Sequence, residues 1–134
     1  MKLPLVCIEG HDICVFQSLE DAALKLELVD IYNNEYEFFD AEGYVVEAYV
    51  VGCNQKRKCK FLFFETYYID HYSGEIKFRR KVPLELRRDE LIRLLITSLN
   101  DRNQSIDTNN LDDLIKKFLF YSNWHFRIQF IIVN

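Results

Sequence analysis

The stretch Tyr36-Glu-Phe-Phe-Asp-Ala-Glu-Gly-Tyr-Val-Val-Glu-Ala-Tyr-Val-Val51 carries the clearest fold signal in the chain. Tyr36 and Phe38 alternate with glutamates, and residues 44–51 alternate between two sides in the same way, which is the period of a β-strand. Between these arms, Asp40-Ala-Glu-Gly43 places aspartate first and glycine fourth, as in a type I turn. The stretch therefore predicts an antiparallel hairpin over residues 36–51.

The segment that follows predicts a second hairpin. Residues 52–60 are polar and are expected to form a loop. The aromatic run over residues 61–69 suits a central strand that is buried on both faces. A turn near Gly74 should then lead into a strand over 75–82, so that residues 61–82 form an antiparallel hairpin.

Helices are expected before and after these hairpins. Ser18 and Asp21 form a capping box, and the helix that they begin should end near residues 28–30. Asn109 or Asn110 should cap a helix that ends near Tyr121. The remaining elements are expected as strands at 3–9, 13–16 and 125–133 and a helix that begins near Glu85 and runs to Leu99. The sequence thus predicts an α+β fold, with residues 1–134 as a single domain around a mainly antiparallel sheet of about six strands with three helices.

The composition indicates a folded chain with a substantial core. At 134 residues, with 49% of them hydrophobic, the chain can bury roughly two thirds of the surface that its unfolded form exposes. No apolar run approaches the roughly 18 residues of a membrane helix. The N-terminal apolar run is too short for a signal peptide, so we expect a cytoplasmic protein that does not contact a membrane.

The four cysteines allow three interpretations. Cys7 and Cys14 lie in apolar runs, where a cysteine acts as a small hydrophobic residue. Cys53 and Cys59 flank a basic loop and lack the Cys-x2-Cys spacing of zinc knuckles. We expect four free thiols and no bound metal, while a Cys53–Cys59 disulfide and a metal site stay open as alternatives.

The sequence predicts no catalytic residue and no cofactor. His11, His71 and His125 are isolated, without the neighbouring base, nucleophile or second ligand that catalysis or metal binding needs. The four glycines do not have the spacing of a phosphate-binding loop. A pair of catalytic carboxylates among residues 27–47 is a weaker alternative than a solvated surface.

The charge of the chain is divided unevenly. Residues 1–55 have a balance of −9 and residues 56–134 a balance of +5, and residues 26–55 contain seven acids without a lysine or arginine. Aromatic residues lie among these acids. Such a surface is typical of a site for a basic partner, because charge speeds encounter and rings anchor the complex. An ordinary solvated hairpin can have the same composition.

Two basic clusters support a different function. Lys56–Lys60 contains four cations in five residues, and Lys77 is followed by Arg79–Lys81. These hairpin segments, 56–60 and 79–81, could bind phosphates in a nucleic-acid-binding or regulatory module. Solvent-exposed cations that prevent a sheet from pairing with its neighbours would look the same. Because the whole chain is acidic, we regard nucleic acid as the less favoured partner.

Part of the chain resembles a known family. The stretch Gly10-His-Asp-Ile-Cys-Val-Phe-Gln-Ser-Leu-Glu-Asp-Ala, followed by Tyr36-Glu-Phe-Phe-Asp-Ala-Glu-Gly43 and Val46-Glu-Ala, resembles small bacterial immunity proteins. These proteins belong to polymorphic toxin systems of the contact-dependent and Rhs types. The resemblance covers about residues 11–48, with a weaker similarity in the helix that ends at Leu99. It implies a cytoplasmic inhibitor without catalytic residues that binds a cognate toxin domain.

The acidic stretch and this resemblance together predict a non-catalytic immunity protein. We expect it to occlude a toxin domain, possibly a basic nuclease, through an acidic and aromatic face, because carboxylates can compete with a polyanion for a cationic cleft. The identity of the toxin and the oligomeric state stay open. The expected partner-binding residues are Glu35, Glu37, Asp40, Glu42 and Glu47 as charged groups, with Tyr32 and Tyr49 as anchors.

Overall fold

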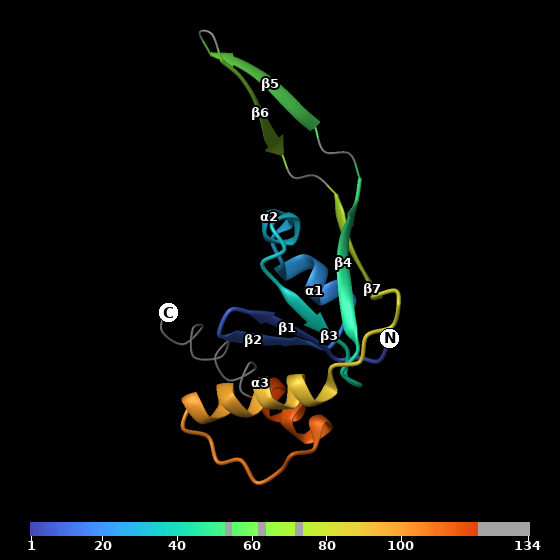
Figure 1. Cartoon of the computed structure of the whole chain (residues 1–134), viewed down its shortest axis with the longest axis vertical. Coiled ribbons are helices and arrows are strands. Elements are labelled where there is room, and N and C mark those ends of the chain that lie inside the picture. Colours follow the sequence, from blue (N-terminus) through green and yellow to red (C-terminus); the bar gives the residue numbers. More distant parts are fainter. Residues whose placement is uncertain (53–54, 62–63, 72–73, 121–134) are drawn as a thin grey trace, which may run out of the picture.

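The computed structural model describes residues 1–52, 55–61, 64–71 and 74–120, with 55–61 and 64–71 described by their backbone alone (Figure 1). A five-stranded sheet has the order β2-β1-β3-β4-β7, and β5 and β6 form a separate two-stranded sheet. All neighbouring strands pair antiparallel. The strands are β1 Leu5–Glu9, β2 Asp12–Phe16, β3 Glu37–Phe39, β4 Val45–Val51, β5 Gln55–Phe61, β6 Phe64–His71 and β7 Glu75–Arg80.

Four helical segments accompany the strands in the described ranges. They are α1 Leu19–Lys25, α2 Leu28–Tyr32, α3 Arg88–Asp101 and a further helix over residues 111–120. The predicted α+β class with an antiparallel sheet is confirmed, whereas the expected six strands and three helices differ from the seven strands and four helices described. None of the described helices is long and apolar enough to cross a membrane.

The helices cover the five-stranded sheet from both sides. One core lies between the sheet and α1 and α2, and it includes Leu5, Cys7 and Phe38. The other core lies between the sheet and the two later helices, and it includes Phe39 and Leu95. Successive residues of one strand, such as Phe38 and Phe39, therefore enter different cores, as the two-residue period of a strand requires.

The hairpin predicted over residues 36–51 is confirmed around its turn, and its ladder covers two residue pairs. Phe38 pairs with Val46, and Phe39 pairs with Val45. The amide of Gly43 donates to the carbonyl of Asp40 at 2.9 Å, which closes the predicted turn. Gly43 has φ +90° and a Cβ there would lie 2.7 Å from Cα of Arg88, so the turn and the start of α3 require glycine.

The hairpin predicted over residues 61–82 is wrong in its pairing. β6 pairs with β5, which occupies the segment expected to be a loop, and these two strands form an arm beyond the ends of β4 and β7 (Figure 1). The aromatic run is therefore not a central strand of the five-stranded sheet. β7 instead pairs with β4 over six residues, because Ile76 and Phe78 continue the apolar side formed by Val46, Ala48 and Val50.

The first helix begins as predicted and ends earlier. The Oγ of Ser18 accepts a hydrogen bond from the amide of Asp21 at 3.0 Å, which confirms the cap. The expected end near residues 28–30 is wrong, because Leu26 is extended with ψ 141° and separates α1 from α2. The break turns the chain so that α2 ends beside β3.

The later helices follow the apolar pattern. Leu91, Leu95 and Leu99 of α3 are fully buried, as their spacing on one helical stripe requires. The Oδ1 of Asn110 accepts from the amide of Asp112 at 2.9 Å, so Asn110 caps the helix over 111–120. The predicted strand over 125–133 lies outside the described residues.

Candidate functional site

Asp40, one of the predicted partner-binding residues, lies inside the fold. Its side chain is fully buried. One carboxylate oxygen accepts from the amides of Glu42 and Tyr44 at 3.0 and 3.1 Å. The other accepts from the amide of Lys2 at 3.3 Å and from Nε of Arg80 at 2.6 Å. Asp40 therefore fixes the turn and the N-terminus, and its carboxylate is not accessible to a partner.

Arg80 joins the turn to β7. Its guanidinium forms ion pairs with both Asp40 and Glu42. It also lies 4.2 Å from the ring centroid of Tyr44, which adds a cation–π contact. The hydrogen bond to Asp40 raises the pKa of Arg80 further above its ordinary value. Glu42 stays half exposed while its charge is compensated by this arginine.

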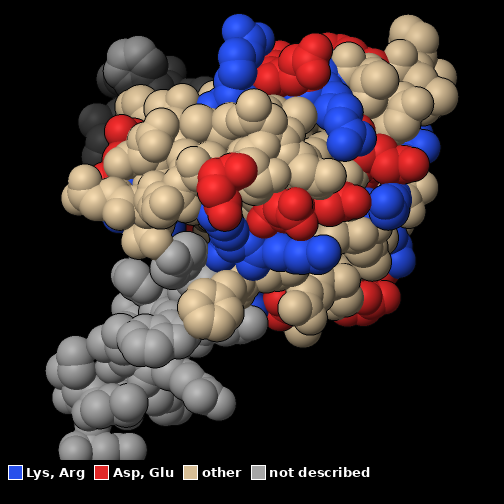
Figure 2. Space-filling view, turned by 90° about the horizontal axis from the view of Figure 1, so that it is seen from below, with Lys and Arg blue, Asp and Glu red and all other residues tan. Residues whose placement is uncertain are grey.

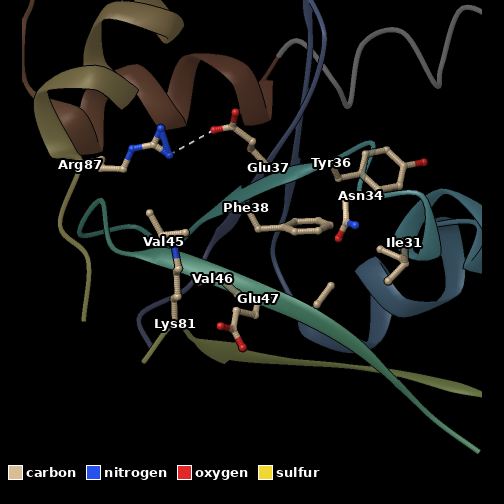
Figure 3. Close-up of a pocket in the computed structure, with 11 residues that line it drawn as sticks. Ile31, Asn34, Tyr36, Glu37, Phe38, Val45, Val46, Glu47, Lys81 and Arg87 are labelled. Atoms are coloured by element: carbon tan, nitrogen blue, oxygen red, sulfur yellow. Dashed lines mark hydrogen bonds and ion pairs between the residues drawn. The ribbon is translucent and has the colours of Figure 1, made fainter. Parts of the chain in front are cut away.

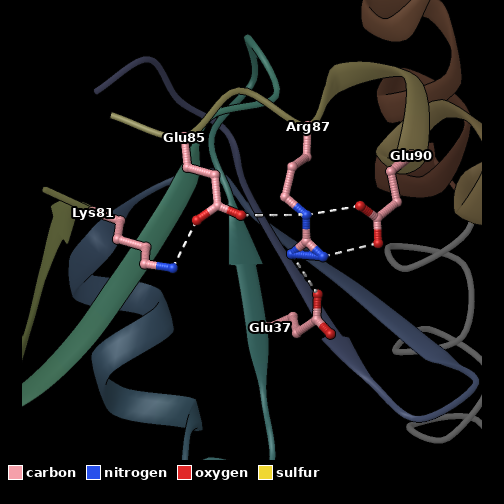
Figure 4. Close-up of polar contacts among 5 residues, drawn as sticks. All are labelled: Glu37, Lys81, Glu85, Arg87 and Glu90. Carbon is pink, nitrogen blue, oxygen red and sulfur yellow. Dashed lines mark hydrogen bonds and ion pairs between the residues drawn. The ribbon is translucent and has the colours of Figure 1, made fainter. Parts of the chain in front are cut away.

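Glu37 belongs to a network around Arg87 (Figure 4). Arg87 Nε and Nη2 donate to Glu90 at 2.7 and 2.9 Å, which makes a bidentate pair. The same guanidinium is 3.4 Å from Glu37 and 3.6 Å from Glu85, and Lys81 is 2.6 Å from Glu85. The network connects β3, the loop after β7 and the first turn of α3.

This network also shifts two pKa values. The hydrogen bond to Glu90 raises the pKa of Arg87. The hydrogen bond from Lys81 lowers the pKa of Glu85 below its ordinary 4.5. Glu37 makes the longer contact with Arg87, and 59% of its side chain is exposed. Glu37 can therefore still meet a cation from outside the molecule.

Glu47 and Tyr49 lie on an exposed part of the sheet. Glu47 accepts from Nε of Arg79 on β7 at 2.9 Å, and Arg79 lies 5.0 Å from the ring centroid of Tyr49. Tyr49 is 39% exposed and Val51 is 50% exposed. Figure 1 shows β4 and β7 extending away from α3, so this end of the sheet is open. Both predicted residues are thus available at the surface.

The acidic sequence does not become a uniformly acidic surface. The predicted basic cluster on β7 supplies partners for it, because Arg79, Arg80 and Lys81 pair with Glu47, Asp40 and Glu42, and Glu85. The face that carries α3 also shows acidic and basic side chains next to each other (Figure 2). Segments with opposite charge in the sequence are therefore brought together by the pairing of β4 with β7.

A slot opens where β3 and β4 diverge (Figure 3). Its volume is about 430 Å³. The ladder between the two strands ends at Phe38 and Val46, and β4 continues without β3 beyond this pair. The apolar lining comes from Ile31, Phe38, Val46 and Ala48, and the charged lining from Glu37, Glu47, Lys81 and Arg87.

Three carboxylates gather beside this slot. Oxygens of Glu9, Asp30 and Glu35 lie within 4.8 Å of one another. Within the described part of the chain, none of the three pairs with a lysine or arginine. Tyr36, which lines the slot, donates to Asp30 at 2.8 Å; burial and this bond raise the pKa of Tyr36. The cluster could attract a cation, and Asp30 and Glu35 contribute to it from the acidic stretch.

The end of α2 positions two further predicted residues. Tyr32 is the last residue of α2 and is 38% exposed. Asn34 has φ 53°, and the amide of Glu35 then donates to the carbonyl of Asp30 at 3.0 Å. This turn places Glu35 in the cluster. Of the predicted residues, the structure therefore brings Glu37 and Glu47 to the slot, Glu35 to the carboxylate cluster, and Asp40 and Glu42 to the turn of the hairpin.

The described cysteines are free thiols. Cys7 is buried and Cys14 is exposed, although they face each other in the β1–β2 register. Burial raises the pKa of Cys7 to about 12, and burial also raises the pKa of Cys14. Both are therefore poor nucleophiles near neutral pH. Cys53 and the side chains of Cys59 and His71 lie outside the described residues, as does His125.

Sequence reasoning missed the residues that neutralise the acidic stretch. It interpreted Arg79–Lys81 as a possible phosphate-binding cluster and gave no role to Arg87. A signal was present, because Lys77, Arg79 and Lys81 alternate along β7 as Glu47 and Tyr49 do along β4. Alternating opposite charges on two strands indicate a cross-strand pair.

Comparisons with protein-family models, with curated proteins and with solved structures found no match. The resemblance to immunity proteins therefore stays a prediction from the quoted motifs.

Proposed function

We propose that this chain is a non-catalytic binding protein of the immunity type. In this proposal it acts in the cytoplasm, where it binds and occludes a basic protein toxin such as a nuclease. The partner is a protein because the slot and the exposed strand offer both apolar and charged surface. The proposal assigns no cofactor to the chain.

The observation that carries this proposal is the uncompensated carboxylate cluster beside the slot. Oxygens of Glu9, Asp30 and Glu35 lie within 4.8 Å of one another, and none of the three has a lysine or arginine partner in the described part of the chain. A cationic partner would find three carboxylates converging at one point of the surface. An acidic patch next to an apolar slot thus favours a basic protein as the ligand.

The predicted residues take different parts in this proposal. Glu35 and Glu37 are the main pairing groups, because both are exposed next to the slot. Glu47 is a weaker contributor, since Arg79 already compensates its charge. Tyr32 and Tyr49 serve as exposed aromatic anchors. Glu42 lies at the turn of the hairpin and is a peripheral contact, and Asp40 contributes by stabilising the fold.

The nucleic-acid alternative gains no support from β7. Lys77, Arg79, Arg80 and Lys81 each form an ion pair with a carboxylate. These cations would have to exchange an existing partner for a phosphate. The side chains of Lys56–Lys60 lie outside the described residues. We therefore propose only the protein-binding function.

The test uses the C-terminal domain of the protein encoded directly upstream of this chain. We expect the two to form a one-to-one complex and the chain to protect cells that express that domain. Replacing Glu35→Lys and Glu37→Lys should slow association at least about tenfold at low salt, because like charges then meet. The parental association rate should fall as salt rises.

A control variant with the same change in net charge is Glu20→Lys with Asp101→Lys, two exposed acids away from the slot. It should associate at close to the parental rate. If both double variants slowed association equally, the slower association would result from the change in net charge, and the site at Glu35 and Glu37 would be contradicted. The absence of a complex with the upstream domain would contradict the immunity function.

A further inference from the structure

The inner edge of β4 carries backbone groups that the β3 ladder does not reach. The carbonyl of Val45 accepts from Lys81 at 2.9 Å and its amide donates to Glu85 at 2.8 Å, so Val45 bonds toward the β7 side. In an antiparallel strand the bonding direction alternates from residue to residue. Glu47 and Tyr49 therefore bond toward β7, whereas Val46, Ala48 and Val50 direct their amides and carbonyls toward β3.

Only the first of these three inward residues has a strand partner on that side. Val46 pairs with Phe38, and the β3–β4 ladder ends there. Ala48 and Val50 pair in register with residues of β7 on the other side alone. On the inner side their amides and carbonyls have no strand partner in the described part of the chain, and Ala48 lines the slot. A strand edge of this kind is a template for an added strand.

The two sides of the slot differ in the way that an alternating strand requires. Ile31, Phe38 and Ala48 belong to the core beneath α1 and α2 or pack against it. Glu37 and Glu47 lie on the opposite side of the same strands, as their positions next to Phe38 and Val46 in the alternation require. An inserted segment would place apolar side chains toward α2 and polar side chains toward the glutamates.

The charges around the slot select a basic segment. Glu35 lies in the uncompensated cluster at the α2 end, and Glu37 keeps an exposed carboxylate. Lys81 and Arg87 also line the slot, but Lys81 is paired with Glu85 and Arg87 with Glu90. The exposed carboxylates of Glu35 and Glu37 therefore favour a basic segment at the inner edge of β4.

We propose that the edge of β4 at Ala48 and Val50 accepts an extended segment of a partner protein as an added strand. The segment alternates apolar residues with lysine or arginine. This inference rests on the proposed protein-binding function and specifies how the partner is held. The backbone bonds supply affinity, and the alternation of side chains supplies specificity.

The test uses the synthetic peptide Lys-Val-Lys-Val-Lys-Val-Lys and the full chain labelled with ¹⁵N. Saturating peptide should slow amide hydrogen exchange at Ala48 and Val50 at least about tenfold. Amides on the outer edge of β7 at Ile76 and Phe78 should change little. A peptide in which glutamate replaces each lysine should bind more weakly, and a peptide with N-methylated alternate amides should lose the protection.

The variant Ala48→Pro removes one donor from the inner edge. Because this amide does not bond to β7, the variant should fold and bind the peptide at least about tenfold more weakly. If the variant does not fold, amide exchange in the parental protein still shows whether the peptide binds at Ala48 and Val50. Protection confined to β7, or absent from Ala48 and Val50 at saturation, overturns the proposal.

The complex with the upstream domain separates this inference from the proposed function. If that domain binds and both amides become protected, strand addition is supported in the natural complex. If it binds while Ala48 and Val50 exchange as fast as in the free protein, the binding function stands and strand addition is overturned. If it does not bind, the immunity function fails, and the peptide measurement still supports or overturns strand addition.

Discussion

The two ends of the β3–β4 hairpin contain similar residues and use them differently. At the turn, Asp40 is buried, and four hydrogen-bond donors converge on its carboxylate. At the other end, Glu37 and Glu47 are partly exposed, and no strand in the described ranges pairs with the inner side of β4 from Glu47 to Val51. Position in the sheet, more than residue type, therefore determines whether an acid stabilises the fold or stays available for binding.

The closed end is held together by an arginine from a distant part of the chain. At the turn, Arg80 pairs with both Asp40 and Glu42. The open end keeps three carboxylates together without a cation in the described residues. Such groups are typical of surfaces where a partner supplies the missing charge. Variants of the two ends should therefore differ in which property they change.

The largest effect is expected for Asp40→Asn at the closed end. The variant keeps the shape of the side chain but removes the charge that Arg80 pairs with, so the free energy of unfolding should fall by about 3 kcal/mol. Urea unfolding followed by circular dichroism measures this change. Glu42→Gln is the matched control, because it removes a half-exposed partner of the same arginine and should cost clearly less. Equal losses in the two variants would contradict the structural role of Asp40.

The next effect concerns the glycine of the turn. Gly43→Ala adds a Cβ that would lie 2.7 Å from Cα of Arg88 at φ +90°, so we expect a loss of at least about 2 kcal/mol. Gly10→Ala is the comparison, because Gly10 has φ +57° and no atom within 4 Å of the added group. It should lose about 1 kcal/mol from backbone strain alone. Thermal unfolding of both variants measures the difference. A smaller loss of stability in Gly43→Ala than in Gly10→Ala would contradict the close approach of Arg88 to the turn.

A smaller effect is expected for the network at the start of α3. Arg87→Ala removes the bidentate pair with Glu90 and the contact with Glu37, which should cost about 1 kcal/mol. Arg93→Ala, on the exposed side of the same helix, should change stability by no more than about 0.5 kcal/mol. Unfolding in urea at low and high salt tests both variants. The difference between them should shrink at high salt, and an unchanged difference would argue against an electrostatic origin.

The smallest effect is a dependence on pH. Lys81 lowers the pKa of Glu85 in the folded protein below its ordinary 4.5. The folded state therefore holds the ionised form more strongly, and this contribution is present above the ordinary pKa and lost as the pH falls through the lowered value. The parental protein should exceed Glu85→Gln in stability near neutral pH, and the difference should shrink as the pH falls below 4.5. Urea midpoints across this range measure it, and a difference that grows in acid would have the wrong sign.

The local elements were predictable because nearby residues specify them. Ser18 caps α1 through a residue three positions on, and Asp40 and Gly43 define a four-residue turn. Neither feature needs information from elsewhere in the chain. The hairpin over 36–51 and the caps were therefore confirmed.

The strand order and the charge compensation depended on residues far apart in the sequence. β7 could pair with β6 or with β4, and the alternation of Ile76 and Phe78 is compatible with both. The choice of β4 brought Arg79 and Arg80 to the acidic hairpin and left the inner edge of β4 open. The exposed residues of the site could be predicted, whereas the burial of Asp40 and the slot could not.

The most direct test of the open edge is residue-resolved hydrogen exchange of β4 in the free protein, measured by NMR. The amides of Glu47 and Tyr49 bond to β7, whereas those of Ala48 and Val50 lie on the inner side of β4. We expect the amides of Ala48 and Val50 to exchange at least about a hundredfold faster than those of Glu47 and Tyr49, since only the latter are held by a ladder bond. Similar protection of all four amides would mean that the inner edge is already occupied, and it would contradict the account of β4 as a binding edge.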